Sequence, residues 1–286
     1  MMSLASPDAA VTAGADRVTW KVHGEMVLLA GWGRAILLQL AHPLVAQGVA
    51  AHSAFLTERR GRLRRLHRTL SAMLTLTFGT REEVAQVART INGIHDRVHG
   101  QLGARHGIFP ERTPYTAHDP ALLTWVHATL VDSFLLTYER FVAPLTAAER
   151  DRYCAESTGI EPLLGIPPGH LPRSMVELTA YMDAMLSGGE LSVTDTARAL
   201  AREVLNPSAV LIGRPLVALA RLPTVGLLPS LIRRAYGLSW DARHERGLRV
   251  LSAGIRRLLP LLPSPLRHWP AARAARARQR HLDRTI

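Results

Sequence analysis

Helix-start signals recur along this sequence, and residues with a helical pattern follow each of them. Thr80-Arg-Glu-Glu83 and Thr146-Ala-Ala-Glu149 have the capping-box pattern, a Thr followed three residues later by a Glu. Asp119-Pro120 combines an N-cap residue with proline at the first helical position. These signals predict one helix over about 81–99, with Gly100 as its stop, and another from 120 to about 142. Further helices are expected over 62–78, 173–187, 194–205 and 241–258.

The composition favours helices over strands throughout the chain. Hydrophobic residues make up 47% of the 286 residues but aromatic residues only 5%, so the core must consist mainly of Leu, Ala, Val and Ile. No run of alternating β-branched residues predicts a sheet. We therefore predict an all-α fold with a single multi-helix globular domain over 17–262. A flexible N-terminal tail (1–16) and a basic, Arg-rich C-terminal extension (263–286) are expected to flank it.

Several classes of protein are disfavoured by the sequence. Cys154 is the single cysteine, which excludes a disulfide within the chain and argues against a cysteine-based zinc site. The N-terminus has no basic region followed by an apolar run, so we expect a cytoplasmic location. The most apolar stretch, 208–232, contains Arg214 and Arg221 and does not predict a membrane span.

The formal net charge of +12 is concentrated near the C-terminus. From Ile232 to the end there are thirteen arginines and three acidic residues, which account for +10 of it. Such a run usually forms a solvated face; the alternative is peripheral contact of the C-terminal tail with an anionic membrane. No aromatic interleaving and no helix-turn-helix pattern accompanies the charge, so no nucleic-acid partner is expected.

His95 lies in the middle of an apolar stripe on its expected helix. At 100° per residue it shares a face with Val84, Val87, Ala88, Ile91, Ile94 and Val98. This pattern predicts burial, and a buried imidazole needs a partner for its nitrogens. That partner is either a metal or a carbonyl or hydroxyl group of the protein, and the position alone favours the second.

His127 repeats this arrangement on the helix that starts at Asp119. It shares a face with Leu123, Leu130, Val131, Phe134, Tyr138 and Phe141. Two such histidines indicate either one shared site or two independent core histidines. Neither helix contains His-x-x-x-His or Glu-x-x-His spacing, which argues against a zinc or di-iron site. His42 precedes Pro43 at an expected break in the chain, and the spacing leaves its role open.

Arg65, Arg68 and Thr69 form a third polar group. Their i, i+3, i+4 spacing places them along one side of a helix. A guanidinium there is suited to hold a carboxylate or to lie at the edge of a pocket. The alternative, a solvated basic face, is the one that the pattern alone favours.

Five segments in order carry a family resemblance. They are Leu38-Gln-Leu-Ala-His-Pro43, His52-Ser53, Arg65-Leu-His-Arg68-Thr69, Ile94-His-Asp-Arg-Val98 and Asp119-Pro-Ala-Leu-Leu-Thr-Trp-Val-His-Ala-Thr-Leu-Val-Asp132. In this order and spacing they resemble the MpaB and latex-clearing-protein family, the rubber oxygenase catalytic domain, over roughly 20–260. The resemblance implies an all-helical fold that holds haem b and uses dioxygen to cleave carbon–carbon double bonds in apolar, isoprenoid substrates.

The resemblance also implies roles for individual residues. His95 takes the place of the iron ligand in the family pattern Arg-x-x-His-x-x-Val, although Asn92 replaces its arginine. Arg68 and Thr69 match the distal, catalytic part of the pattern Arg-x-x-Lys-Thr, with Arg68 in place of the lysine. A guanidinium does not readily lose its proton, so Arg68 is not expected to become an iron ligand.

The remaining candidates are expected to contact the cofactor. Arg65 is a candidate anchor for a haem propionate, and His127 and His42 are further cofactor-binding candidates. Two alternatives to an oxygenase stay open, a haem-binding sensor or carrier without turnover and a binding protein of the membrane surface.

Overall fold

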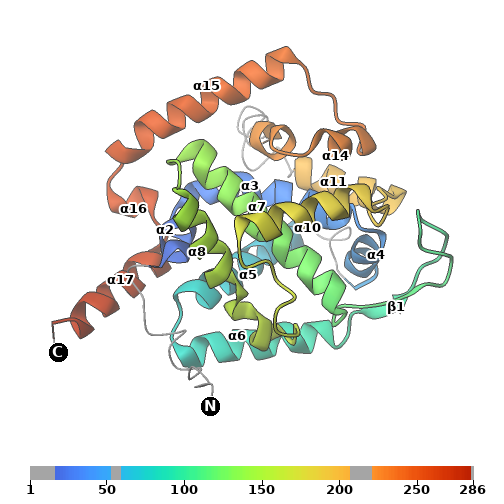
Figure 1. Cartoon of the computed structure of the whole chain (residues 1–286), viewed down its shortest axis with the longest axis horizontal. Coiled ribbons are helices and arrows are strands. Elements are labelled where there is room, and N and C mark those ends of the chain that lie inside the picture. Colours follow the sequence, from blue (N-terminus) through green and yellow to red (C-terminus); the bar gives the residue numbers. More distant parts are fainter. Residues whose placement is uncertain (1–16, 53–58, 207–220, 285–286) are drawn as a thin grey trace.

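The computed structural model describes residues 17–52, 59–206 and 221–284, and over 59–66 it describes the backbone alone (Figure 1). The first half contains α2 (Val18–His23), η1 (Met26–Leu28), α3 (Leu29–Leu40), α4 (Pro43–His52), α5 (Arg59–Phe78), α6 (Arg81–His95), β1 (His99–Gln101), β2 (Pro114–Thr116) and α7 (Pro120–Phe141). The second half contains α8 (Ala147–Ser157), η2 (Thr158–Ile160), α9 (Glu161–Leu164), α10 (Met175–Ser187), α11 (Asp195–Leu205), α14 (Ser230–Ala235), α15 (Ala242–Leu258), η3 (Leu259–Leu261), α16 (Ser264–Arg267) and α17 (Pro270–Leu282). The predicted all-α fold is confirmed. The expected N-terminal tail, 1–16, lies outside the described residues.

The predicted helix starts are present with their hydrogen bonds. Thr80 and Glu83 form a reciprocal capping box at α6, with the Thr80 backbone N–H donating to the Glu83 carboxylate over 2.8 Å. Thr146 and Glu149 do the same at α8. At α7 the Asp119 carboxylate accepts a hydrogen bond of 2.8 Å from the N–H of Ala121. These caps satisfy backbone donors that have no partner within the helix.

The predicted stop of α6 at Gly100 is wrong, because the helix ends at His95. Beyond it the chain enters β1, which pairs antiparallel with β2 so that His99 faces Thr116 and Gly100 faces Tyr115. The Tyr115 ring covers Gly100, where a Cβ atom would lie 2.7 Å from the Tyr115 Oη atom. The hairpin therefore needs a glycine at this position, and it returns the chain to the end of α6.

The close packing of α3 against α7 forms the centre of the molecule (Figure 1). A Cβ atom on Gly31 would overlap the Thr137 Oγ1 atom and lie 3.0 Å from the carbonyl oxygen of Ser133. The absence of a side chain at Gly31 thus lets the two helix backbones approach. The hydrophobic core builds outward from this contact and includes Leu37, Leu38, Trp125 and Phe134, all buried.

Arg34 binds the same two helices through polar contacts. The buried guanidinium forms an ion pair with Asp132 over 2.6 Å, donates to the Ser133 Oγ atom over 2.7 Å and donates to the Leu227 carbonyl over 2.7 Å. All three of its nitrogens therefore have a partner. A buried charge with such a set of partners is stable, whereas removal of one partner leaves it uncompensated.

The C-terminal segment packs on the body of the protein. Buried Glu25 accepts hydrogen bonds from Arg267, the shortest of them 2.6 Å. Trp269, Ala272 and Ala275 are buried against a cluster that includes Phe78 of α5. The expected extension is therefore helical, but one side of α17 is not solvated.

One helix among the described residues has the length and the apolar composition of a membrane span. It is α7, and 67% of its most apolar window is buried inside the protein. A core helix passes the same test of length and composition. The pair formed by Met26–Leu40 and Pro43–His52 meets it together but bends by 105° at the break.

The α3–α7 contact predicts a specific sensitivity at Gly31. Replacement of Gly31 by alanine should lower the free energy of unfolding by about 1–3 kcal/mol, because the added methyl group overpacks the contact. Gly254→Ala on α15 is the matched control, since a Cβ there meets nothing within 4 Å. It should be neutral or stabilising by about 1 kcal/mol, as alanine favours helix. Urea denaturation checks both, and equal effects at the two positions would contradict the packing argument.

Candidate functional site

His95 is the last residue of α6 and is half-buried, where the sequence pattern predicts full burial. Its Nδ1 atom is buried and has no hydrogen-bond partner among the described residues. Burial also lowers the pKa of His95, since it disfavours the charged imidazolium. His95 therefore offers a neutral imidazole with an unpaired nitrogen.

The apolar stripe around His95 is only partly covered by the protein. Ala88 is buried, Ile91 and Val98 are half-buried, and Ile94 is 49% exposed. The end of α6 therefore combines an unpaired imidazole with accessible apolar side chains. An apolar helix face that the protein leaves accessible commonly marks a binding surface.

His118 lies against His95, a contact that the sequence analysis missed. The centroids of the two rings are 5.7 Å apart and the rings meet edge to face at 80°. The His118 Nε2 atom is 2.7 Å from the Asp96 Oδ1 atom, which fixes the ring beside the end of α6. The β1–β2 hairpin brings His118 back to this point, because the Ala117 N–H donates to the Val98 carbonyl over 2.8 Å. Helix periodicity gives no signal for such a contact.

Asn92, one turn before His95, joins α6 to α9. Its Nδ2 atom donates to the Leu163 carbonyl over 2.9 Å, while its buried Oδ1 atom has no hydrogen-bond partner in the described part of the chain. Asn92 stands where the family pattern has an arginine, and in this chain its side chain binds the backbone of α9.

His127 on α7, like His95, has one unpaired imidazole nitrogen. Its Nε2 atom is buried without a hydrogen-bond partner among the residues described, as are the Oγ1 atom of Thr124 and the Nε1 atom of Trp125. Burial lowers the pKa of His127 to about 4. Buried polar atoms are usually paired, so three unpaired atoms within one turn of α7 mark this turn as a candidate binding region.

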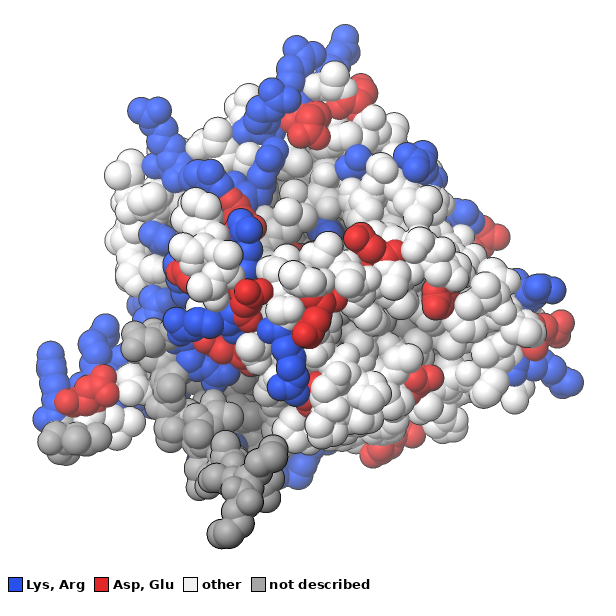
Figure 2. All heavy atoms as spheres, viewed as in Figure 1, with Lys and Arg blue, Asp and Glu red and all other residues white. Residues whose placement is uncertain are grey.

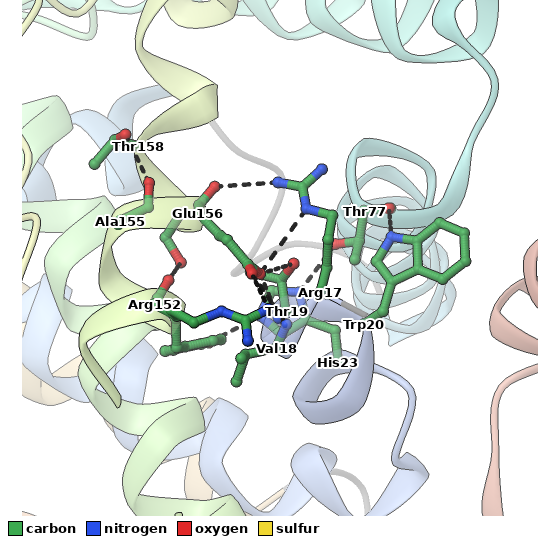
Figure 3. A network of polar contacts seen from close by, with 12 residues as sticks. Arg17, Val18, Thr19, Trp20, His23, Thr77, Arg152, Ala155, Glu156 and Thr158 are labelled. Atoms are coloured by element: carbon green, nitrogen blue, oxygen red, sulfur yellow. Dashed lines mark hydrogen bonds and ion pairs between the residues drawn. The ribbon is translucent and has the colours of Figure 1, made fainter. Parts of the chain in front are cut away.

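His23 is a neighbour of His127 that the sequence analysis also missed. Its Nδ1 atom lies 2.9 Å from the Thr77 Oγ1 atom, and its Nε2 atom 2.9 Å from the Tyr153 Oη atom. It thus links α2, α5 and α8, next to the Glu156 carboxylate that accepts hydrogen bonds from the first turn of α2 (Figure 3). Burial, and secondarily the charge on His127, lowers the pKa of His23 to about 3. Since both nitrogens are paired, His23 holds helices together.

His42 lies elsewhere, between α3 and α4. Its side chain is buried, its ring centroid is 5.2 Å from that of Phe109, and its Nδ1 atom has no hydrogen-bond partner among the described residues. Burial lowers the pKa of His42 to about 4, against the opposing effect of the Glu190 and Asp119 carboxylates. His42 therefore contacts different residues from those that contact His95.

Arg68 and Thr69 are exposed on α5. Helices α5 and α6 pack against each other on either side of the turn at Gly79. At about 1.5 Å per residue, Arg68 lies roughly 15 Å from this turn along α5 and His95 roughly 21 Å along α6. The Arg65 backbone falls close to the level of His95, but its side chain lies outside the described set.

The described residues contain no group of three or more His, Cys, Asp or Glu side chains that could hold a metal ion. The candidate site is instead made of single imidazoles with apolar neighbours. A neutral imidazole of this kind can be the one protein ligand of a metal whose remaining ligands come from a cofactor.

A comparison with protein families matches residues 20–257 to one family model. Its description is ER-bound oxygenase mpaB/B'/Rubber oxygenase, catalytic domain. Neither the curated proteins nor the solved structures contain a match. The matched segment includes every candidate residue discussed above.

The lowered pKa of His127 predicts a pH dependence of stability. An unfolded histidine titrates near 6.5 but His127 near 4, so the unfolded chain binds more protons between these values. His127 therefore contributes stability that is fully present above pH 6.5 and is lost as the pH falls, by about 1 kcal/mol per pH unit. His127→Gln should make unfolding free energy less steep in pH, measured by urea denaturation from pH 7 to pH 5. Thr129→Ser, a buried change on the same helix without a titrating group, should leave the slope unchanged; an unchanged slope in His127→Gln would refute the assignment.

Proposed function

The chain belongs to the mpaB and rubber oxygenase catalytic-domain family, and we propose that it is a haem-dependent oxygenase that acts on an apolar, unsaturated substrate with dioxygen. Family membership gives the oxygenase class. The cofactor and the kind of substrate rest on the side chains of this chain. The observation that carries the proposal is the unpaired, buried Nδ1 atom of His95 beside accessible apolar residues of α6.

The residues at the end of α6 fit haem b. A porphyrin supplies four of its own nitrogens to the iron, so the protein needs to add one ligand and an apolar wall. His95 offers the ligand and its lowered pKa keeps the imidazole neutral, which is the form that binds metals. Haem b, when bound, supplies the redox-active iron that dioxygen chemistry requires.

His118 and Asp96 are proposed to orient His95. Asp96 holds the His118 ring, and the His118 and His95 rings meet edge to face. This contact limits rotation of the His95 side chain. Such outer contacts commonly set the direction of a metal-binding histidine. Asn92 supports the same turn of α6 from the α9 side.

The other candidates receive roles that depend on their charge. Arg65 is proposed to bind a haem propionate, because a guanidinium fork matches a carboxylate. Arg68 and Thr69 are proposed to act on the open side of the haem. Arg68 keeps its proton at any ordinary pH, so it donates hydrogen bonds and does not ligate iron.

Trp125, His127 and His42 are proposed as further pocket residues. Each has a buried polar atom that no described group satisfies, and a pocket that positions a substrate or cofactor needs a few such atoms among apolar walls. His127 has the stronger case, since Thr124, three residues earlier on the same side of α7, adds another such atom.

Loss of the His95 ring should remove haem from the protein. We expect His95→Ala to lower the haem content per chain at least about tenfold and to abolish the Soret band, because the sole proposed ligand is gone. His170→Ala, at an exposed position between α9 and α10, is the control and should keep the haem of the parent. Circular dichroism checks that both variants fold. Parental haem content and an unshifted Soret maximum in His95→Ala would show that another residue binds the iron.

Removal of the Arg68 guanidinium should leave haem in place and alter the open side. Arg68→Ala is expected to change the affinity of the haem protein for cyanide by about tenfold, since a hydrogen-bond donor is lost. Its oxygen uptake with an unsaturated lipid should change by about as much. Arg89→Ala on the exposed side of α6 is the control. If Arg68→Ala binds cyanide and consumes oxygen as the parent does, Arg68 has no role at this site.

A further inference from the structure

The segment from α15 to α16 exposes an unusual number of aliphatic side chains. Val250 is 73% exposed, Leu258 61%, Leu261 77% and Leu266 65%, and Leu262 is exposed as well. We refer to residues 242–266 as the α15–α16 surface. Several exposed aliphatic side chains within one short segment commonly mark a surface that contacts a partner or a membrane.

Arginines surround these side chains. Arg243, Arg246, Arg249, Arg256 and Arg257 are all exposed on α15. Figure 2 shows Lys and Arg atoms gathered over α15, along the upper left edge of the molecule. Glu245 is the one acidic residue within the helix, and it is engaged by the Trp240 Nε1 atom over 3.0 Å and lies 3.8 Å from Arg140. The surface is thus strongly cationic as well as apolar.

The two kinds of side chain are ordered on the helix. Leu248 and Ser252 are buried and face the protein. On the opposite side, Val250 lies between Arg246 and Arg257 at helical spacing, so arginines flank this exposed aliphatic residue of the outer face. An amphipathic helix with this order places its apolar residues in the acyl boundary and its arginines at the headgroups.

A shallow, largely open groove of about 530 Å³ lies on the same helix. Its lining consists of Leu222, Arg243, Arg246, Gly247, Val250 and Leu251. The two guanidinium groups are suited to a phosphate headgroup, and the aliphatic residues to the first carbons of an acyl chain. Both parts of a phospholipid thus find complementary groups within one groove.

We propose that the α15–α16 surface docks this protein on an anionic phospholipid membrane. Arg256 donates to the Glu139 carbonyl, which leaves four arginines of α15 for this role. The combination of exposed leucines with these arginines selects such a surface, because neither a purely polar partner nor a neutral apolar one matches both. The proposal goes beyond the oxygenase function and does not depend on it. It places the membrane contact on a helix of the folded domain.

We do not assign the contact to the C-terminal segment, although six arginines follow residue 266, four of them in α17. Arg267 is held by Glu25, Arg276 donates to the Trp20 carbonyl, and Arg278 donates to the Phe78 carbonyl. These guanidinium groups are directed at the protein. The exposed face of α17 also lacks the leucines that the α15–α16 surface presents, Leu282 near its end excepted.

Co-sedimentation of the full chain with vesicles tests the proposal. The parent should bind phosphatidylcholine vesicles that contain phosphatidylserine, and bind those without it at least about tenfold more weakly, with binding that falls as salt rises. Leu258→Asp/Leu261→Asp should weaken binding to the anionic vesicles at least about tenfold, since two inserted side chains become charged. Arg249→Gln/Arg257→Gln should weaken it by about as much and reduce the salt dependence.

Matched controls separate this surface from general effects of charge. Val176→Asp changes an equally exposed aliphatic residue on α10, and Arg89→Gln/Arg202→Gln removes two exposed arginines elsewhere. Both should bind like the parent, and circular dichroism should show all variants folded. Equal binding of the α15–α16 variants and the controls would overturn the proposal. So would a parent that ignores vesicles but forms a dimer that Leu258→Asp/Leu261→Asp dissociates, because the surface would then contact a second copy of the chain.

Discussion

The close approach of α3 to α7 at Gly31 is the contact on which the rest of the structure depends. Because no side chain separates the helices there, Thr137 and Ser133 lie directly against α3, and Arg34 reaches Asp132. This contact fixes α7 in the middle of the molecule (Figure 1). Among the candidate residues, His127 lies on this helix, whereas His95 lies on α6.

Two separate candidate regions involve this central helix or the residues just before it. His127 on α7 lies near His23, and the charge on His127 contributes to the lowered pKa of His23. The residues just before α7 bring His118 against His95 at the end of α6. The histidines differ in whether their ring nitrogens have hydrogen-bond partners. His23 has a partner on each nitrogen and joins helices, whereas His95 and His127 each keep one buried nitrogen unpaired among the described residues.

Local signals in the sequence predicted most of the helices but only part of the site. The capping boxes at Thr80 and Thr146 act over three residues, so they can be read without a fold. His118 could not be found in this way, since its contact with His95 depends on a hairpin that pairs His99 with Thr116. The docking of the C-terminal segment depends on Glu25 and Arg267, which are 242 residues apart. Both contacts are set by tertiary structure, and periodicity carries no information about them.

We propose that the folded chain carries one haem b through an imidazole at the end of α6. The most direct measurement is a pyridine haemochrome assay, together with metal analysis, on the full chain purified from cells supplied with haem. We expect a Soret band, the haemochrome spectrum of haem b and one iron per chain. A folded, monodisperse chain with no Soret band, or with a metal that no porphyrin accompanies, would contradict it.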